Sequence, residues 1–174
     1  YETMQKLDAI AGAADAPSWV LAYLQMPGMN GLELQTALAR TRNPLPIVFL
    51  TGHGDIPSTV RAMREGAVDF LEKPFEKSVL LKAIEDAFAR ITAAGGASAK
   101  AADAEVVLAV LTPRERDVLE GLARGLPNKT IAYDLDISPR TVEVHRANLM
   151  AKLGVRSLSD ALRIAFAAGM GSEA

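Results

Sequence analysis

Residues 126–146 read LPNKTIAYDLDISPRTVEVHR and contain two helix starts separated by a short turn. We expect Asn128 to cap a helix over residues 129–135, after which the chain turns. Ser138 then caps a longer helix that runs to about Leu153 and has proline at its first position. Two helices joined in this way, the second of them carrying cations, are typical of a helix-turn-helix motif.

Further helices are predicted on both sides of this motif. The stretch TPRE at residues 112–115 is a capping box with proline at the first helical position, and Gly125 ends the helix that it starts. Ser157 begins a last helix that extends through Ala168. We therefore expect an all-α domain over residues 109–174.

The preceding part of the chain alternates between short apolar runs and amphipathic segments. We expect the apolar runs to be buried strands, over residues 19–23, 47–50 and 67–71. We expect helices over residues 2–11, 32–40, 57–65 and 78–92. This alternation is typical of a doubly wound α/β fold around a parallel sheet.

A stretch of small residues separates the two halves of the chain. Residues 95–102 read GGASAKAA, and a short apolar helix is predicted directly after them. We therefore expect a partly helical linker over residues 95–108, between an α/β domain over 1–94 and the all-α domain.

Composition excludes several functional classes. The 174 residues include no cysteine and two histidines, His53 and His145, which fall in different halves. Thiol chemistry is therefore excluded, and we expect no metal and no enzyme activity. The sequence has no apolar run of membrane-spanning length and no signal peptide at its start, so we expect a cytoplasmic protein without a membrane partner.

Charge is distributed unevenly along the chain. The whole chain has a formal net charge of −2, whereas residues 111–172 carry nine cations and seven anions. Within residues 138–156 there are four cations and one anion. This local excess of positive charge fits contact with phosphates, and it also fits an ordinary solvated surface.

The ends of the three predicted strands carry Tyr23, Thr51 and Lys73. Functional residues of doubly wound folds gather at these carboxyl ends. The Thr51 hydroxyl and the Lys73 ammonium can together bind an oxyanion there. The alternative is that Thr51 only caps a turn and Lys73 is an ordinary surface cation.

Three motifs in this half resemble the receiver domain of bacterial response regulators. They are VLAYLQMPGMNG at residues 20–31, LTGHGD at residues 50–55 and DFLEKPF at residues 69–75. The resemblance implies a flavodoxin-like domain in which a histidine kinase phosphorylates an aspartate beside a magnesium ion. It also implies that Thr51, Phe70 and Lys73 respond to the phosphoryl group.

The receiver-like half departs from that family where the phosphoryl group is accepted. Tyr23 stands at the phosphoacceptor position, and a phenol offers no carboxylate for an acyl phosphate. The family's acidic pair and first strands are also missing, so no cofactor is expected for the chain as written, and Mg²⁺ only in a longer native chain. Three explanations stay open: a longer native protein, a divergent receiver in which Tyr23 fixes one state of the switch, or a sheet edge covered by another chain.

The C-terminal half resembles the LuxR-type DNA-binding domain, so that the whole chain resembles response regulators of the FixJ/NarL type. The matching motifs are LTPRER at residues 111–116, NKTIA at 128–132 and ISPRTVEVH at 137–145. The resemblance implies that the second helix of the motif enters the major groove of DNA. Residues expected near base edges are Glu143, Val144, Ala147 and Asn148. Residues expected to contact phosphates are Lys129, Arg140, Thr141, His145, Arg146 and Lys152.

These features together predict a sequence-specific, DNA-binding transcriptional regulator of a two-component phosphorelay, with a receiver that acts independently of phosphorylation. We expect double-stranded DNA, a second copy of the chain and a sensor histidine kinase as partners. Dimer contacts are expected on the last helix, from Leu158, Ala161, Leu162 and Ala165. The alternative function is a degenerate receiver that serves as a protein-interaction module and docks a kinase or another regulator.

Overall fold

The computed structural model describes residues 18–26, 28–40, 45–52, 54–92 and 104–172. The helix predicted over residues 2–11 and the small-residue stretch at 95–102 lie outside these ranges. Contacts divide the chain into two compact units, one of residues 1–53 and 65–94 and the other of residues 54–64 and 95–174.

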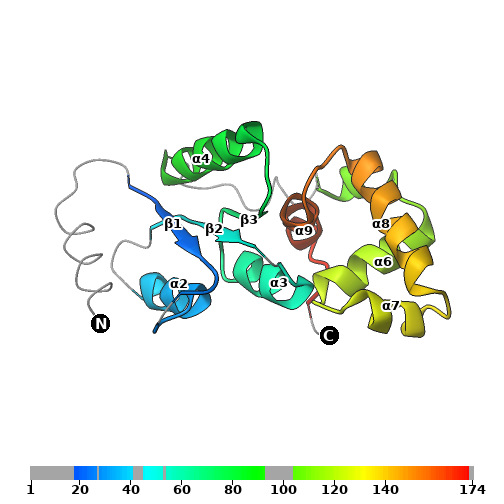
Figure 1. Cartoon of the computed structure of the whole chain (residues 1–174). Helices are drawn as coiled ribbons and strands as arrows, with labels where there is room; N and C mark the ends of the chain where they lie inside the picture. The colour runs from blue at the N-terminus through cyan, green and yellow to red at the C-terminus, as the bar shows by residue number, and fades with distance from the viewer. Residues whose placement is uncertain (1–17, 27, 41–44, 53, 93–103, 173–174) are drawn as a thin grey trace. The chain divides into compact units, whose positions relative to one another are not determined.

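The first unit contains the parallel sheet that the sequence predicts, with strand order β1-β2-β3 (Figure 1). Its strands are β1 (Val20–Tyr23), β2 (Ile47–Thr51) and β3 (Asp69–Glu72), and its helices are α2 (Gly31–Ala39) and α4 (Lys77–Thr92). In register, Tyr23 lies beside Leu50 and Thr51 lies beside Glu72. The three strands therefore end at one edge, as expected for parallel strands.

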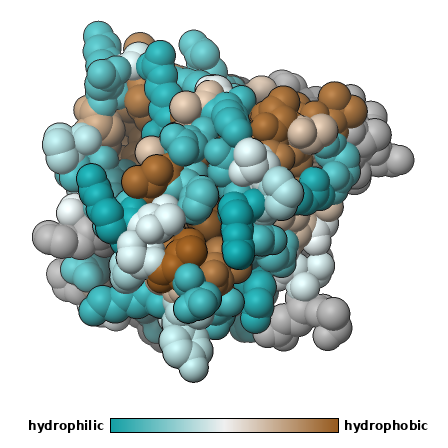
Figure 2. Space-filling view, turned by 90° about the vertical axis from the view of Figure 1, so that its right-hand side faces the viewer, coloured by the Kyte–Doolittle hydropathy of each residue, from teal (hydrophilic) through white to brown (hydrophobic). Residues whose placement is uncertain are grey.

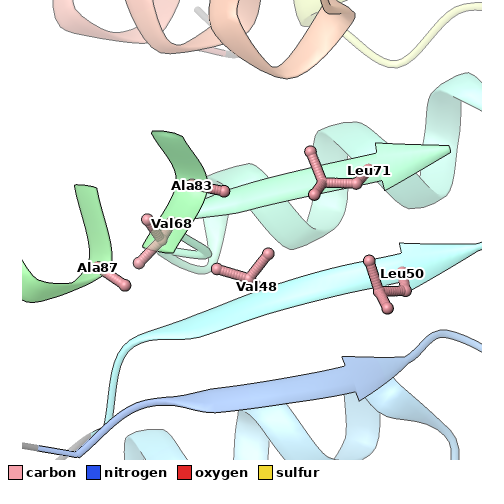
Figure 3. Close-up of a cluster of buried hydrophobic side chains, with 6 residues drawn as sticks. All are labelled: Val48, Leu50, Val68, Leu71, Ala83 and Ala87. Carbon is pink, nitrogen blue, oxygen red and sulfur yellow. The ribbon is translucent and has the colours of Figure 1, made fainter. Parts of the chain in front are cut away.

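Side chains of β2 and β3 alternate between the two faces of the sheet. On one face, Val48 and Leu50 of β2 and Leu71 of β3 pack with Ala83 and Ala87 of α4 in a buried cluster, which Val68 joins from just before β3 (Figure 3). On the other face, the rings of Phe49 and Phe70 lie 6.0 Å apart between their centroids. Helix α2 starts against this face at Gly31, where an added Cβ would lie 2.8 Å from a ring carbon of Phe49. Because both faces of the sheet are covered, consecutive residues of these strands are apolar, and their sequences form continuous hydrophobic runs.

The second unit is helical. Its elements are α3 (Ile56–Arg64), a helical turn over residues 104–108, α6 (Pro113–Ala123), α7 (Asn128–Asp134), α8 (Pro139–Leu153) and α9 (Leu158–Ala167). Its core contains Val118, Leu119, Leu122, Ile131, Val142, Leu149 and Leu162, each at most 1% exposed. The predicted helices of the C-terminal half are confirmed to within one or two residues. In this division the segment 54–64, which includes α3, falls in the second unit, and the predicted domain boundaries stay a prediction.

Helix caps in the second unit follow the sequence with one exception. The capping box of Thr112 and Glu115 is formed at the start of α6, and the Ser138 hydroxyl accepts from the Thr141 amide at the start of α8. The prediction that Asn128 caps α7 is wrong: the cap position is Pro127 and has no side-chain hydrogen bond. The Asn128 side-chain oxygen instead accepts a hydrogen bond from Arg146 of α8. A contact between two helices thus replaces the cap within one helix that the sequence predicts.

On the side of the molecule drawn in Figure 2, hydrophilic residues predominate and apolar residues gather in a few patches. Within the described ranges, no helix is both long and apolar enough to cross a membrane.

Candidate functional site

Helices α7 and α8 form the predicted helix-turn-helix. The turn between them contains Asp136 in the left-handed region, with φ of 54°, a conformation that aspartate tolerates better than most residues. Buried Val142 and Leu149 fix the inward face of α8. The opposite face carries the four residues that the sequence places near base edges, and all four are exposed: Glu143, Val144, Ala147 and Asn148. This face is therefore available to a partner.

Charged side chains occupy the beginning of the exposed face. Arg140 donates a hydrogen bond of 2.8 Å to the Glu143 carboxylate, and the two side chains are 83% and 51% exposed. Lys129 and Thr141 also belong to the motif. Lys129 is exposed, whereas Thr141 and His145 are half-buried. An exposed pair of this kind contributes little to folding. Arg140 and Glu143 can therefore separate and contact DNA with little loss of folding stability.

Arg146 has a more enclosed position on α8. Its guanidinium donates to the Asn128 side-chain oxygen at 2.9 Å, which ties the middle of α8 to the start of α7. Burial lowers the pKa of Arg146, and the nearby Glu143 carboxylate acts in the opposite direction. Arg146 also lines a shallow cavity of about 280 Å³ together with Leu122, Glu143, Ala147, Leu149, Met150 and Leu158.

Lys152 is paired with Glu115, the carboxylate that also forms the capping box of α6. The Lys152 ammonium donates to Glu115 Oε2 at 2.7 Å, and the Glu115 side chain is 4% exposed. The same carboxylate oxygen accepts the backbone N–H of Thr112 at 2.8 Å. These bonds, that of Lys152 first, lower the pKa of Glu115 from 4.5 to about 2. The capping-box pattern signals Glu115, but nothing in the sequence signals its pairing with Lys152.

The residues predicted to form a dimer surface on α9 differ in exposure. Ala161, Leu162 and Ala165 are fully buried, whereas Leu158 is partly exposed. The three buried residues pack inside the second unit, because the apolar stripe of a helix is used first for its own core. The dimer surface stays a prediction, and of its four residues Leu158 is the one whose side chain is partly exposed.

At the strand ends of the first unit, Tyr23 and Lys73 are brought together. The Lys73 ammonium donates to the Tyr23 hydroxyl at 3.1 Å and lies 4.6 Å from the centre of the tyrosine ring. Lys73 is also anchored through its backbone, since its N–H donates to the Thr51 carbonyl at 2.8 Å. Thr51 and Phe70 are each 5% exposed. The two outer strands are therefore bridged across the end of the central strand.

This arrangement does not fit the magnesium ion that a receiver domain implies. A phenol is a poor magnesium ligand, and the ammonium beside it repels a divalent cation. Within the described part of the chain, no three histidine, aspartate or glutamate side chains are grouped as a metal site.

A receiver-like α/β unit joined to a helix-turn-helix with an exposed second helix defines a transcriptional response regulator. Comparison with known proteins agrees: residues 2–85 match the family model of the response regulator receiver domain, and residues 109–165 match that of the luxR family of bacterial regulatory proteins. The chain belongs to the FixJ/NarL type of response regulators, and it is a DNA-binding transcriptional regulator of a two-component system.

The relatives include the transcriptional regulatory protein FixJ of two bacteria. The chain is 50% identical to FixJ of Rhizobium meliloti over 93% of its own length and 80% of the relative's. It is 48% identical to FixJ of Bradyrhizobium diazoefficiens over 94% and 79%. Among solved structures, full-length FixJ from B. japonicum is 47% identical, with a TM-score of 0.46, covering 95% of this chain and 81% of that one.

Proposed function

We propose that this regulator binds a specific DNA sequence as a homodimer and does so independently of phosphorylation at position 23. The observation that carries the second part is the bridge between Tyr23 and Lys73. The first part is supported by the exposed face of α8. We propose that the protein acts in the cytoplasm, with a sensor histidine kinase as a further partner, and that it is not an enzyme.

Base reading is assigned to the exposed face of α8. A carboxylate at Glu143 accepts from the amino group of cytosine, and Val144 contacts the methyl group of thymine. Ala147 and Asn148 lie one turn further along the same face. Lys129, Arg140, Thr141 and His145 flank this face and fix the register on the phosphates. A dimer places two such helices in successive major grooves, which a single small domain cannot do.

Independence from phosphorylation follows from the chemistry at the strand ends. A receiver needs a carboxylate that accepts a phosphoryl group, and position 23 offers a phenol. The lysine that would respond to that group already has a hydrogen-bond acceptor and a ring to lie against. The chain therefore keeps Lys73 engaged without any phosphoryl group.

Treatment with Mg²⁺ and a small phosphodonor, acetyl phosphate, tests this part of the proposal. We expect the intact mass of the protein and its affinity for a selected DNA duplex to stay unchanged. A receiver protein with aspartate at this position serves as the positive control for the reagent. A stoichiometric phosphoryl adduct on any residue, accompanied by a change in affinity, contradicts the proposal.

A second candidate function is the docking of a protein partner by the receiver-like unit. It is favoured by exposed apolar side chains on α4, where Leu81, Phe88 and Ile91 are 48%, 41% and 37% exposed. Weak binding to all DNA duplexes alike at physiological salt would favour the docking of a protein partner over sequence-specific regulation. A strong preference for one selected duplex would favour the regulator.

A further inference from the structure

Two of the six residues that the sequence assigns to DNA phosphates are bonded to side chains of another helix of the DNA-binding domain, whereas the side chains of Arg140 and Thr141 bond only to neighbours three positions away. Lys152 pairs with Glu115 at 2.7 Å, and Arg146 donates to Asn128 at 2.9 Å. Lys129 differs from both, because it is exposed and, within the described ranges, has no ion pair or side-chain hydrogen bond. The cations of the motif therefore fall into two groups, one already committed within the protein and one available.

The pair of Lys152 and Glu115 is much less exposed on its acidic side. The Glu115 side chain is 4% exposed, whereas that of Lys152 is 38% exposed. A carboxylate in this position is costly unless its partner stays in place, because removing the cation leaves a buried charge unpaired. If Lys152 moved to a DNA phosphate, Glu115 would be left in that state. The pair is therefore expected to persist when DNA is bound.

The two ties join α8 to α6 and to α7. Glu115 lies in the first turn of α6, and Lys152 lies in the last turn of α8. Asn128 is the first residue of α7, and Arg146 is in the middle of α8. The segment that carries the exposed residues Glu143, Val144, Ala147 and Asn148 is therefore held at its middle and one turn beyond its end, so the ties set the direction in which this face points.

We propose that Lys152 is a positioning residue: its ion pair with Glu115 holds the end of α8 on the start of α6, and it does not neutralise a DNA phosphate. Arg146 provides the second tie, to α7. This inference rests on the proposed DNA binding and changes the role of two cations within it. It predicts that specificity for sequence, rather than electrostatic affinity, depends on Lys152.

The experiment compares Lys152→Met with Lys129→Met in the full chain. The probes are a duplex selected from a random-sequence pool and a scrambled duplex of the same length. For each variant we measure the slope of log affinity against log salt concentration, the ratio of the two affinities and the urea midpoint. Lys129→Met is expected to reduce the slope by about 0.9 per subunit, with the affinity ratio unchanged.

Lys152→Met is expected to leave the salt slope as in the wild type, to lower the urea midpoint and to lower the affinity ratio several-fold. Lys152→Arg, which keeps a cation that can pair with Glu115, is expected to restore the ratio. Glu115→Gln removes the ion pair from the acidic side and keeps a side-chain oxygen that can accept the cap hydrogen bond of α6. It is expected to lower the ratio as Lys152→Met does.

The inference is overturned if Lys152→Met reduces the salt slope as Lys129→Met does while the urea midpoint and the affinity ratio stay at wild-type values. It is also overturned if Glu115→Gln strengthens binding to both duplexes and steepens the slope, since a released Lys152 would then be reaching phosphates. If the wild type prefers no duplex, the proposed function fails, and a double-mutant cycle of Glu115 and Lys152 in urea still tests the tie. Additive effects in that cycle would contradict it.

Discussion

Tyr23 illustrates how one side chain changes the chemistry of a whole site. It lies at the end of β1, is half-exposed, and accepts a hydrogen bond from Lys73. A carboxylate in this place would attract both Mg²⁺ and the ammonium, whereas the phenol supports only the ammonium. The ring adds a second attraction, since a cation 4.6 Å from its centre lies within the range of a cation–π interaction.

Replacing Tyr23 by phenylalanine separates the two attractions. Tyr23→Phe removes the hydrogen bond and keeps the ring, so we expect a loss of stability of no more than about 1 kcal/mol, small because the pair is exposed to solvent. Urea unfolding measures it. Tyr133→Phe is the matched control, because Tyr133 is 86% exposed and loses only a solvated hydroxyl. Equal midpoints for the two variants would contradict a contribution from the Lys73 bond.

Glu115 makes stability depend on pH in a defined direction. Its pKa is about 2 in the folded protein, below the ordinary value of 4.5, so the folded state binds this proton less readily than the unfolded state. The stabilisation is present in full above about pH 4.5 and is lost as the pH falls toward 2. We therefore expect the urea midpoints of the wild type and Glu115→Gln to converge as the pH is lowered through this range. A difference that grows toward low pH would contradict this assignment.

At the scale of elements, α8 depends on its first turn. Ser138 accepts the Thr141 amide at 3.0 Å, and Pro139 follows in the position where a helix tolerates proline best. The C-terminal end is closed by Gly154 in the left-handed region, with φ of 65°. Both ends of α8 are thus specified by residues that the sequence identifies. The helix between them has few buried residues, so its caps matter more than they would in a core helix.

Removing the Ser138 cap tests this dependence. Ser138→Ala is expected to destabilise the protein by about 1 kcal/mol, because one amide of the first turn loses its acceptor. Ser138→Asn retains an acceptor and is expected to behave as the wild type does. Thermal unfolding followed by helical circular dichroism gives both values. A loss in the asparagine variant as large as in the alanine variant would show that the hydroxyl acts in some other way.

At the scale of the whole molecule, the salt dependence of DNA binding depends on how many cations contact phosphates and how many are paired inside the protein. Only Lys129 and Arg140 remain as charged phosphate contacts in each subunit if Arg146 and Lys152 are committed to the fold. A dimer then has a salt slope of about −3.6 on B-form DNA, since each neutralised phosphate contributes about −0.9. Fluorescence anisotropy across a range of salt concentrations measures it. A slope near twice that value would show that all four cations reach phosphates.

The elements and the helix-turn-helix could be predicted from the chain because their causes are local. Apolar runs, the TPRE capping box and the Ser-Pro helix start act within a few residues, and the structure confirms the predicted strands and helices that fall within the described ranges. Asn128 shows the limit of this reasoning. It is a good local cap, but a hydrogen bond from a residue 18 positions away takes its side chain.

The sequence alone was sufficient for the family, the order of the elements, the exposed face of α8 and the absence of a carboxylate at position 23. Only the tertiary structure showed which charged groups are already paired. Lys73 with Tyr23 and Lys152 with Glu115 are 50 and 37 positions apart in the chain. The sequence pattern of a cation on a helix is the same whether its side chain contacts a DNA phosphate or a buried carboxylate. The difference lies in the burial of its partner, which depends on how α6, α7 and α8 pack.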